Sequence, residues 1–315
     1  MIDLKENSLK HKTTIGGQAL IEGVMMKGPE KISMAVRKPD SVIELKVDNI
    51  SSIGKKYKIL SLPFIRGVVG LVEAMIIGTN ALMYSADFFE EDQEEEPKET
   101  VFEKIFKDRA GDVSMFFTVA FSIMISILVF MIIPNVLTSV FKKWVGNPIY
   151  LNMIEGVIRV SIFFIYVMWI SKLDDIKRVF EYHGAEHKSI HCYENMEELT
   201  VENVRRQPIL HPRCGTSFLF MVMIISIFVL SFFGWPSPLQ RILIRILMFP
   251  VIAGISYEVN RLIGKSDSKL SYILSYPGLM IQKYATVREP DDSQIEVAIE
   301  ALVSVIPANK DDDLW

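Results

Sequence analysis

Histidines concentrate in one short part of the chain. Four of the five fall within residues 183–211, and three of these lie in the segment YHGAEHKSIHC at 182–192. His183 and His187 are four residues apart, so on a helix their imidazoles would project from one face about 6 Å apart, a spacing that one metal ion can bridge. With Glu186 beside them, the spacing is that of the H-x-x-E-H motif of the inverted zinc peptidases, in which the glutamate activates water.

The motif leaves open where further metal ligands would come from. His191 continues the same helix face but lies about 12 Å along the axis from His183, so the expected first pair is His183 with His187 or His187 with His191. The segment HPRCGTS at 211–217 brings an imidazole and a thiol three residues apart, both good zinc ligands. Glu258 lies at about the sequence distance where the inverted zinc peptidases carry their third ligand. The candidates for completing the site are therefore His191, His211, Cys214 and Glu258.

Nitrogen and sulfur ligands suit zinc or another late first-row ion rather than magnesium or calcium. We therefore expect a divalent metal, with zinc preferred, and Glu186 as the catalytic residue of a metal-dependent enzyme such as a hydrolase. Two other interpretations stay open at this point. The metal could be structural without catalysis, or the segment could be a polar helix with surface histidines and unreactive thiols.

The chain is too apolar for an ordinary soluble protein of 315 residues. Half of its residues are hydrophobic, yet 23% are charged, which indicates an embedded core with sizeable aqueous segments. A helix needs about 20 apolar residues to cross a bilayer. Four stretches qualify, at 115–133, 149–170, 217–235 and 239–259. The lipid bilayer is therefore the expected partner, whereas a net charge of -4 gives no argument for nucleic-acid binding.

Several charged residues lie in apolar surroundings and need partners. Glu155 and Arg159 are four residues apart on one helix face, which predicts a neutralising pair within the helix. Arg245 should face the interior of the helix bundle or a polar cavity. The isolated carboxylates Glu22 and Glu73 are expected either to pair with a nearby arginine, such as Arg66, or to line the polar site.

Lysine and arginine predict the orientation in the membrane. They are frequent in 1–58, in 172–213 and after residue 260, but sparse in 138–148 and absent from 234–240. The positive-inside rule then places both termini and the histidine segment in the cytoplasm. Segment 59–89 is nearly long enough to span, but a fifth span would move the basic N-terminal segment outside. We therefore interpret it as an amphipathic or re-entrant helix at the interface.

The predicted fold class is mainly α, a polytopic membrane helix bundle of about four spans plus an interfacial amphipathic helix, with a small N-terminal β-hairpin. The hairpin is expected at 32–47, where apolar residues alternate around a Lys-Pro-Asp-Ser turn. An amphipathic helix is expected at 291–305. The predicted divisions are a cytoplasmic segment 1–58, the helix 59–89, an acidic linker 90–112, a membrane core 113–260 with the cytoplasmic loop 172–216, and a cytoplasmic segment 261–315.

Three separated motifs carry a family resemblance. GGQALIEGVMM at 16–26, YHGAEHK at 182–188 and HPRCGT at 211–216 together resemble the bacterial YqhQ family, over about residues 14–305. The resemblance implies a multi-pass protein of the bacterial inner membrane. That family is usually described as metal-dependent membrane enzymes, so the resemblance implies such an activity, but it implies no particular substrate.

A function of a different class is a non-enzymatic metal-binding scaffold or a small inner-membrane transporter. In a transporter, charged residues within the spans would line a polar path, namely Glu155, Arg159, Arg245 and Glu258. Four spans without an internal repeat disfavour a carrier, although a homo-oligomer could supply the missing helices.

Overall fold

The computed structural model describes residues 11–50, 57–90, 110–266 and 268–315, and the chain divides into two compact units. The first unit contains Met1–Phe89, Val167–Ile225 and Phe249–Trp315. The second contains Glu90–Tyr166 and Ser226–Met248. All the candidate metal ligands therefore belong to the first unit. The predicted acidic linker at 90–112 lies mostly outside the described residues.

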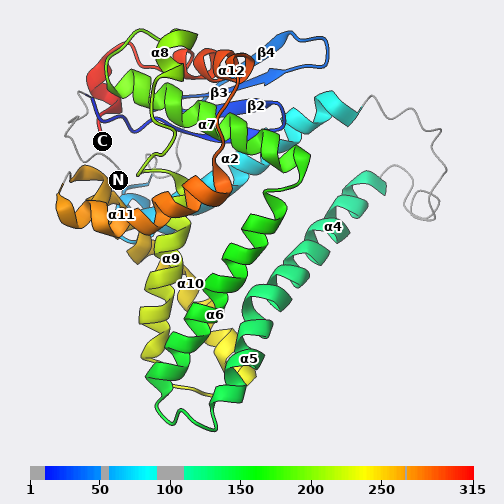
Figure 1. Cartoon of the computed structure of the whole chain (residues 1–315), viewed down its shortest axis with the longest axis vertical. Helices are drawn as coiled ribbons and strands as arrows, with labels where there is room; N and C mark the ends of the chain where they lie inside the picture. Colours follow the sequence, from blue (N-terminus) through cyan, green and yellow to red (C-terminus); the bar gives the residue numbers. More distant parts are fainter. Residues whose placement is uncertain (1–10, 51–56, 91–109, 267) are drawn as a thin grey trace. The chain divides into compact units, whose positions relative to one another are not determined.

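The N-terminal part of the first unit is a four-stranded antiparallel sheet (Figure 1), whose order follows the chain. Its strands are β1 (Gly16–Leu20), β2 (Gly23–Lys27), β3 (Lys31–Arg37) and β4 (Ile43–Asn49). The predicted hairpin is confirmed as β3–β4. A second hairpin, β1–β2, lies in the glycine-rich motif and turns at Glu22, whose φ is 48°. Sequence reasoning missed it because β2 is buried along nearly its whole length, which leaves no alternation of apolar and polar residues.

One face of the sheet packs against two helices (Figure 1), α7 (Asp174–Glu194) and α12 (Asp292–Val303). The predicted amphipathic helix is α12, which begins with a capping box between Asp291 and Gln294. The fully buried residues of this core include Val24, Ala35, Tyr182, Ile295 and Leu302. The short helix α8 (Val201–Arg205) packs on α7. The packing of this core fixes the position of α7, whose residues from Gly184 to Glu194 are all buried.

The other face of the sheet packs against α2 (Ile65–Glu90), which has two distinct sides. Ala81 is buried against the sheet, with Ile77 and Tyr84 packed around it. The opposite side is apolar and exposed, with side chains three, four and seven residues apart: Val72, Met75, Ile76, Leu82 and Met83. A helix with one side on protein and an apolar side exposed is suited to contact with lipid.

Four helices in the described part of the chain are long and apolar enough to cross a membrane. They are Ile65–Phe89, Phe117–Phe141, Pro148–Ile170 and Pro238–Lys265. The number agrees with the prediction, but the membership differs, because the expected span at 217–235 is the shorter helix α9 (Gly215–Ser231). Its 17 residues extend about 26 Å, less than the roughly 30 Å of a hydrocarbon core. The fourth long apolar helix is instead α2.

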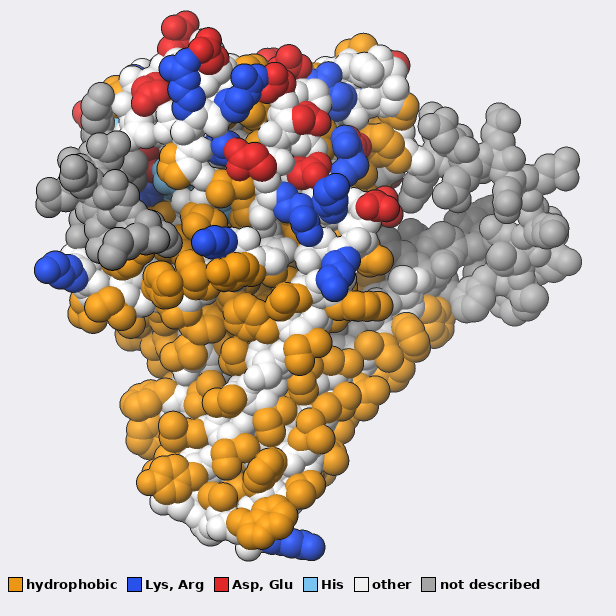
Figure 2. Space-filling view, in the orientation of Figure 1, with side chains coloured by type: hydrophobic (Ala, Val, Ile, Leu, Met, Phe, Trp, Pro, Cys, Tyr) orange, Lys and Arg blue, Asp and Glu red, His pale blue; other side chains and the backbone are white. Residues whose placement is uncertain are grey.

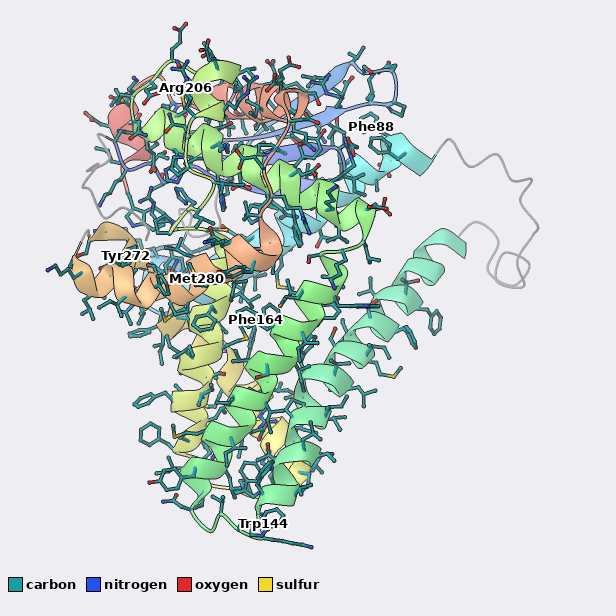
Figure 3. The ribbon with its side chains drawn as sticks, in the orientation of Figure 1. Phe88, Trp144, Phe164, Arg206, Tyr272 and Met280 are labelled. Atoms are coloured by element: carbon teal, nitrogen blue, oxygen red, sulfur yellow. The ribbon has the colours of Figure 1, made fainter. Side chains whose placement is uncertain are left out.

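The helices of the second unit expose apolar side chains to their surroundings. A continuous helical segment runs through α4 (Ala110–Ile127), the π-helical turn η3 (Leu128–Ile132) and α5 (Ile133–Phe141). Pro134 follows the π turn, because proline lacks the N–H that would continue the regular ladder. Hydrophobic side chains cover α4, α5 and α6 (Pro148–Ile170) in Figure 2, and Trp144 projects from the α5–α6 connection in Figure 3. The chain is thus a multi-pass membrane protein in contact with lipid.

The second unit also encloses a cluster of charged side chains. Glu155 of α6 is 1% exposed, and its Oε1 accepts a hydrogen bond of 2.8 Å from Arg159, so the predicted pair is confirmed. The same oxygen accepts from Arg245 of α10 (Pro238–Lys265). Arg241 lies 3.9 Å from the other carboxylate oxygen and donates to Asn135 at 2.8 Å. One buried carboxylate therefore lies within 4 Å of three arginines, of which Arg241 and Arg245 are buried.

This sharing makes Glu155 more important for stability than any one of its partners. Glu155→Ala would leave three guanidinium groups without an anion, whereas Arg159→Ala leaves the contacts with Arg245 and Arg241. Each uncompensated charge in the bilayer costs on the order of 2–3 kcal/mol. We therefore expect Glu155→Ala to accumulate less in membranes, by immunoblot, than Arg159→Ala or the double variant Glu155→Ala/Arg159→Ala. Equal accumulation of Glu155→Ala and the unaltered protein would contradict this account.

Candidate metal centre

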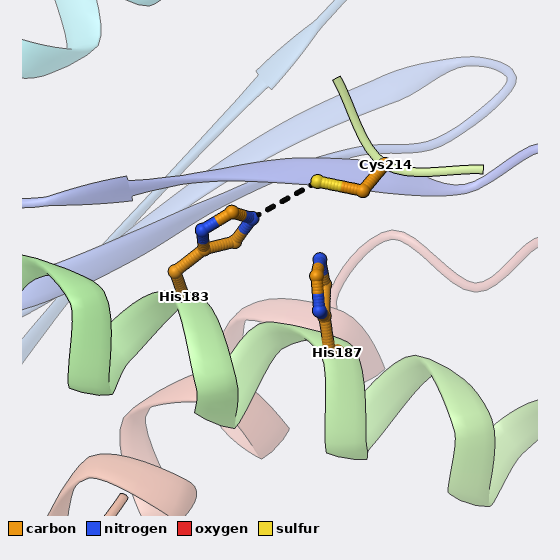
Figure 4. A group of neighbouring side chains, drawn as sticks. All are labelled: His183, His187 and Cys214. Atoms are coloured by element: carbon orange, nitrogen blue, oxygen red, sulfur yellow. Dashed lines mark hydrogen bonds between the residues drawn. The ribbon is translucent and has the colours of Figure 1, made fainter. Parts of the chain in front are cut away.

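The histidine motif lies on α7, as the spacing predicted. The helix begins with Asp174 and Asp175 in its first turn, where carboxylates favourably oppose the positive end of the helix dipole. His183 and His187 project from one face, and their ring centroids are 4.4 Å apart. Figure 4 shows both rings turned towards Cys214, which immediately precedes α9. The chain therefore folds back between residues 187 and 214 to bring the two motifs together.

Backbone carbonyls fix which nitrogen of each ring faces the centre. His183 Nδ1 donates to the carbonyl oxygen of Thr286 at 2.9 Å, and His187 Nδ1 donates to that of Ile209 at 2.8 Å. Both Nε2 atoms therefore face the centre, and an outer hydrogen bond of this kind is usual for metal-binding histidines. His187 Nε2 is buried with no hydrogen-bond partner among the described residues. His183 Nε2 lies 3.1 Å from Cys214 Sγ (Figure 4).

The donor atoms of His183, His187 and Cys214 all lie within 4.8 Å of one another. A zinc ion would bind nitrogen at about 2.1 Å and sulfur at about 2.3 Å, which small side-chain movements would allow here. The three residues are largely buried, which limits competition from solvent. Two nitrogens and one sulfur thus form a plausible set of ligands, and a fourth position remains for water or a substrate.

Two residues that sequence reasoning missed position this group. They belong to the π-helical turn η4 (Gln282–Thr286), which follows α11 (Lys269–Ile281). The side chain of Gln282 is fully buried and forms two hydrogen bonds with the backbone of His211, at 2.9 and 2.8 Å. Thr286 supplies the carbonyl that orients His183. Neither had a visible signal, because one amide side chain and one carbonyl far along the chain form no motif.

The thiol and the imidazole form a charged pair. Burial raises the pKa of Cys214, but His183 and His187 outweigh that effect and hold the pKa well below its ordinary value. Burial likewise lowers the pKa of His183, but the Cys214 thiolate outweighs it and raises the pKa to about 9. Both shifts favour the form in which His183 Nε2 carries the proton and Cys214 the negative charge. A metal ion would have to displace that proton.

A second group of possible ligands lies beside the first. The donor atoms of His191, Glu194 and His211 also fall within 4.8 Å of one another. However, the Arg213 guanidinium forms an ion pair with Glu194 and lies 3.4 Å from His211 Nε2. A cation already occupies this position, so we favour the first group for a metal. His191 and His211 extend the row of rings, with the His187 and His211 centroids 5.5 Å apart.

The glycine-rich motif at 16–26 holds Glu186 in position beside the candidate metal ligands. Its Oε1 accepts a hydrogen bond of 3.0 Å from the backbone N–H of Gly17 in β1, and its Oε2 is buried without a partner among the described residues. A Cβ at position 17 would lie 2.5 Å from the carbonyl oxygen of Met25 and 3.0 Å from Glu186 Cδ. Only glycine therefore lets the strand approach so closely. Burial raises the pKa of Glu186, and His183 and His187 partly oppose this.

The reactive groups meet at a cavity of about 250 Å³. Glu186, His187, His211 and Cys214 contribute to its lining, together with residues from β1, β2, α2 and the C-terminal Trp315. A water molecule takes about 30 Å³ of liquid, so the cavity has room for several waters or for a small polar group. The arrangement can therefore admit a substrate group to the proposed fourth ligand position.

The other candidate residues lie elsewhere. Glu258 is not among these ligands, because its carboxylate pairs with Arg66, whose Nε lies 2.7 Å from Oε1. Glu22 forms an ion pair with Arg178 and Glu73 lies 4.0 Å from Lys27. Cys192 belongs to the hydrophobic core, with its Sγ 3.5 Å from the carbonyl oxygen of Glu198. Burial raises the pKa of Cys192 to about 11, which makes it an unreactive thiol.

Comparison with known proteins agrees with the three-motif resemblance. The uncharacterized protein YqhQ of Bacillus subtilis (strain 168) is 36% identical over 300 residues, which cover 93% of this chain and 92% of that protein. No solved structure matches the chain. A family model described as a protein of unknown function, DUF1385, matches residues 62–308, which include the histidine motif and Cys214. The chain therefore belongs to the DUF1385 family.

Proposed function

We propose that this protein is a membrane-bound, metal-dependent hydrolase that uses one zinc ion. The observation that carries the proposal is the convergence of three donor atoms, from His183, His187 and Cys214, within 4.8 Å of one another. The free oxygen of Glu186 lies buried in the same surroundings, at the same cavity. Three protein ligands with an open fourth position are typical of catalytic rather than structural zinc.

The residues divide the work between binding and proton transfer. Zinc bound here would polarise a carbonyl or phosphoryl oxygen and lower the pKa of a water molecule. Glu186 would accept the proton of the attacking water and pass it to the leaving group, a role that its raised pKa favours. The N–H of Gly17 keeps one carboxylate oxygen in place and leaves the other for the proton.

The proposed location is the cytoplasmic face of the inner membrane. The long apolar helices support membrane insertion, and the lysines and arginines of 1–58 and 172–213 favour a cytoplasmic side for the first unit. Hydrolysis would then act on a substrate at the cytoplasmic membrane surface. In Figure 2, charged side chains gather over the part of this unit formed by α7, α8 and α12.

A transporter is less well supported. The charged residues of the second unit close around Glu155 instead of lining a channel, and the cavity beside Arg241 and Arg245 measures only about 10 Å³. Glu258, the fourth residue of that suggested path, lies in the first unit and pairs with Arg66. A metal-binding scaffold remains the alternative that experiment should separate from an enzyme.

The substitution Glu186→Gln separates the two. Glutamine keeps the size of the side chain and the oxygen that accepts from Gly17, but it cannot take a proton. We expect zinc content equal to that of the unaltered protein and failure to complement a strain lacking the gene. His183→Ala/His187→Ala, as the control, should lose both zinc and complementation. Full complementation by Glu186→Gln would reject the hydrolase and favour a structural metal.

A further inference from the structure

A second, larger cavity of about 780 Å³ lies next to the metal centre in the first unit. Thr14, Lys27 and Trp315 line both this cavity and the smaller one, so the two adjoin. Its other walls come from the 3-10 turn η1 (Lys58–Ser61), from the N-terminal part of α2 and from the C-terminal end of α10. A group bound here would therefore lie close to the proposed zinc site.

The cavity has a marked excess of positive charge. Four cationic residues line it against one carboxylate, that of Glu73. The cations are Lys27, Lys58, Arg66 and Arg261. Arg66 is paired with Glu258 and Lys27 approaches Glu73. Lys58 and Arg261 form no direct salt bridge with a described residue, although Glu258 also attracts Arg261 from a longer distance. Two cations without a direct salt bridge line one cavity, and this excess of positive charge favours an anion such as a phosphate group.

Exposed apolar side chains lie next in sequence to residues that line the cavity. Ile59 and Leu62 flank the lining residues of η1 in sequence, and Leu262 follows Arg261; they are 69%, 51% and 68% exposed. The side of α2 that carries Val72 and Met75 is likewise exposed and apolar. A basic cavity bordered by apolar side chains, at the end of a long apolar helix, matches an amphiphile with an anionic head and hydrocarbon tails.

We propose that this cavity binds the phosphate of an anionic glycerophospholipid, with Lys58 and Arg261 as the main contacts. Because Thr14, Lys27 and Trp315 also line the smaller cavity, the head group would extend towards Cys214 and Glu186, which line that cavity. If the protein is the proposed hydrolase, on which this step rests, its substrate is a lipid of this class that enters from the membrane. The binding itself does not depend on zinc.

Binding of dihexanoyl-phosphatidylglycerol to the detergent-purified full chain tests the proposal. We expect it to bind at least tenfold more tightly than dihexanoyl-phosphatidylcholine or glycerol 3-phosphate, since only it combines net negative charge with tails. Lys58→Gln/Arg261→Gln should lose this preference, with at least tenfold weaker binding. Lys172→Gln/Lys177→Gln, which removes the same charge from exposed positions outside the cavity, should bind normally.

The zinc content of each variant shows whether it has folded. As a second control, Lys58→Arg/Arg261→Lys keeps both positive charges and should keep the lipid preference. Equal binding of the two lipids, or equal weakening in the Lys172/Lys177 control, would overturn the proposal. Glycerol 3-phosphate that binds as tightly as the lipid would overturn it in favour of a free phosphate ester. His183→Ala/His187→Ala should lose zinc but retain lipid binding, so a failure of the hydrolase and a failure of the lipid site can be told apart.

Discussion

Cys214→Ala is expected to weaken zinc binding by at least about 100-fold, because it removes one of three protein ligands and the negative charge among them. The other cysteine supplies a matched control. Cys192→Ala removes a thiol from the same helix as the histidines, but from the core instead of the metal group, and should leave zinc affinity unchanged. Competition with a chelator of known affinity measures both. Equal affinity in Cys214→Ala and the unaltered protein would exclude the thiolate as a ligand.

The pH dependence of zinc binding tests the effect of Cys214→Ala in a second way. In the unaltered protein zinc must displace the proton from His183, whose pKa is about 9. Below that value affinity should rise about tenfold per pH unit, and above it the rise should stop. Cys214→Ala removes the thiolate that raises this pKa, so its affinity should level off at a lower pH. The same plateau in both proteins would contradict the thiolate–imidazolium pair.

Glu194→Ala is expected to destabilise the first unit by about 3–5 kcal/mol, because it leaves the buried Arg213 guanidinium without its counter-charge. Glu194 is 0% exposed and also accepts a hydrogen bond of 2.9 Å from the Thr13 N–H. That cost is a large part of the 5–15 kcal/mol by which a typical domain is stable. Thermal unfolding in detergent should show a clear loss of stability.

An exposed ion pair of the same unit provides the control. Glu202 and Arg206 (Figure 3) are paired four residues apart, but both side chains are about two-thirds exposed or more, at 71% and 67%. Such a pair contributes at most about 1 kcal/mol, so Glu202→Ala should unfold nearly at the temperature of the unaltered protein. Comparable destabilisation by the two substitutions would mean that Arg213 finds other compensation when Glu194 is absent.

The sequence predicted those parts of the centre that depend on local spacing. The four-residue interval between His183 and His187 predicts that both side chains lie on one face of a helix, and both lie on α7. Cys214 was one of four candidates for a further ligand, with His191, His211 and Glu258, and the sequence did not choose among them. The contacts that hold Glu186 and His211 could not be predicted, since Gly17 and Gln282 reach them through long-range packing that leaves no local pattern.

The sequence predicted the number of long apolar helices correctly, but it did not predict all four segments that form them. The stretch at 217–235 is apolar throughout, but its helix α9 ends at Ser231 and is shorter than the four long apolar helices. Segment 59–89 contains Arg66 and Glu73, which argued against a span, yet α2 is long and apolar enough for one. Its charged residues have partners or contacts within the fold, such as Glu258 for Arg66, and a hydropathy pattern cannot show such partners.

The zinc content of the full chain, purified in detergent without added metal, tests the central claim most directly. We expect one zinc per chain by elemental analysis and none in His183→Ala/His187→Ala, with the Cys192→Ala protein retaining its zinc. A single ion is expected because Arg213 already places a positive charge in the second group of ligands. Absence of zinc or a similar transition metal from the unaltered protein, even after addition of the ion, would contradict the metal centre and the function proposed for it.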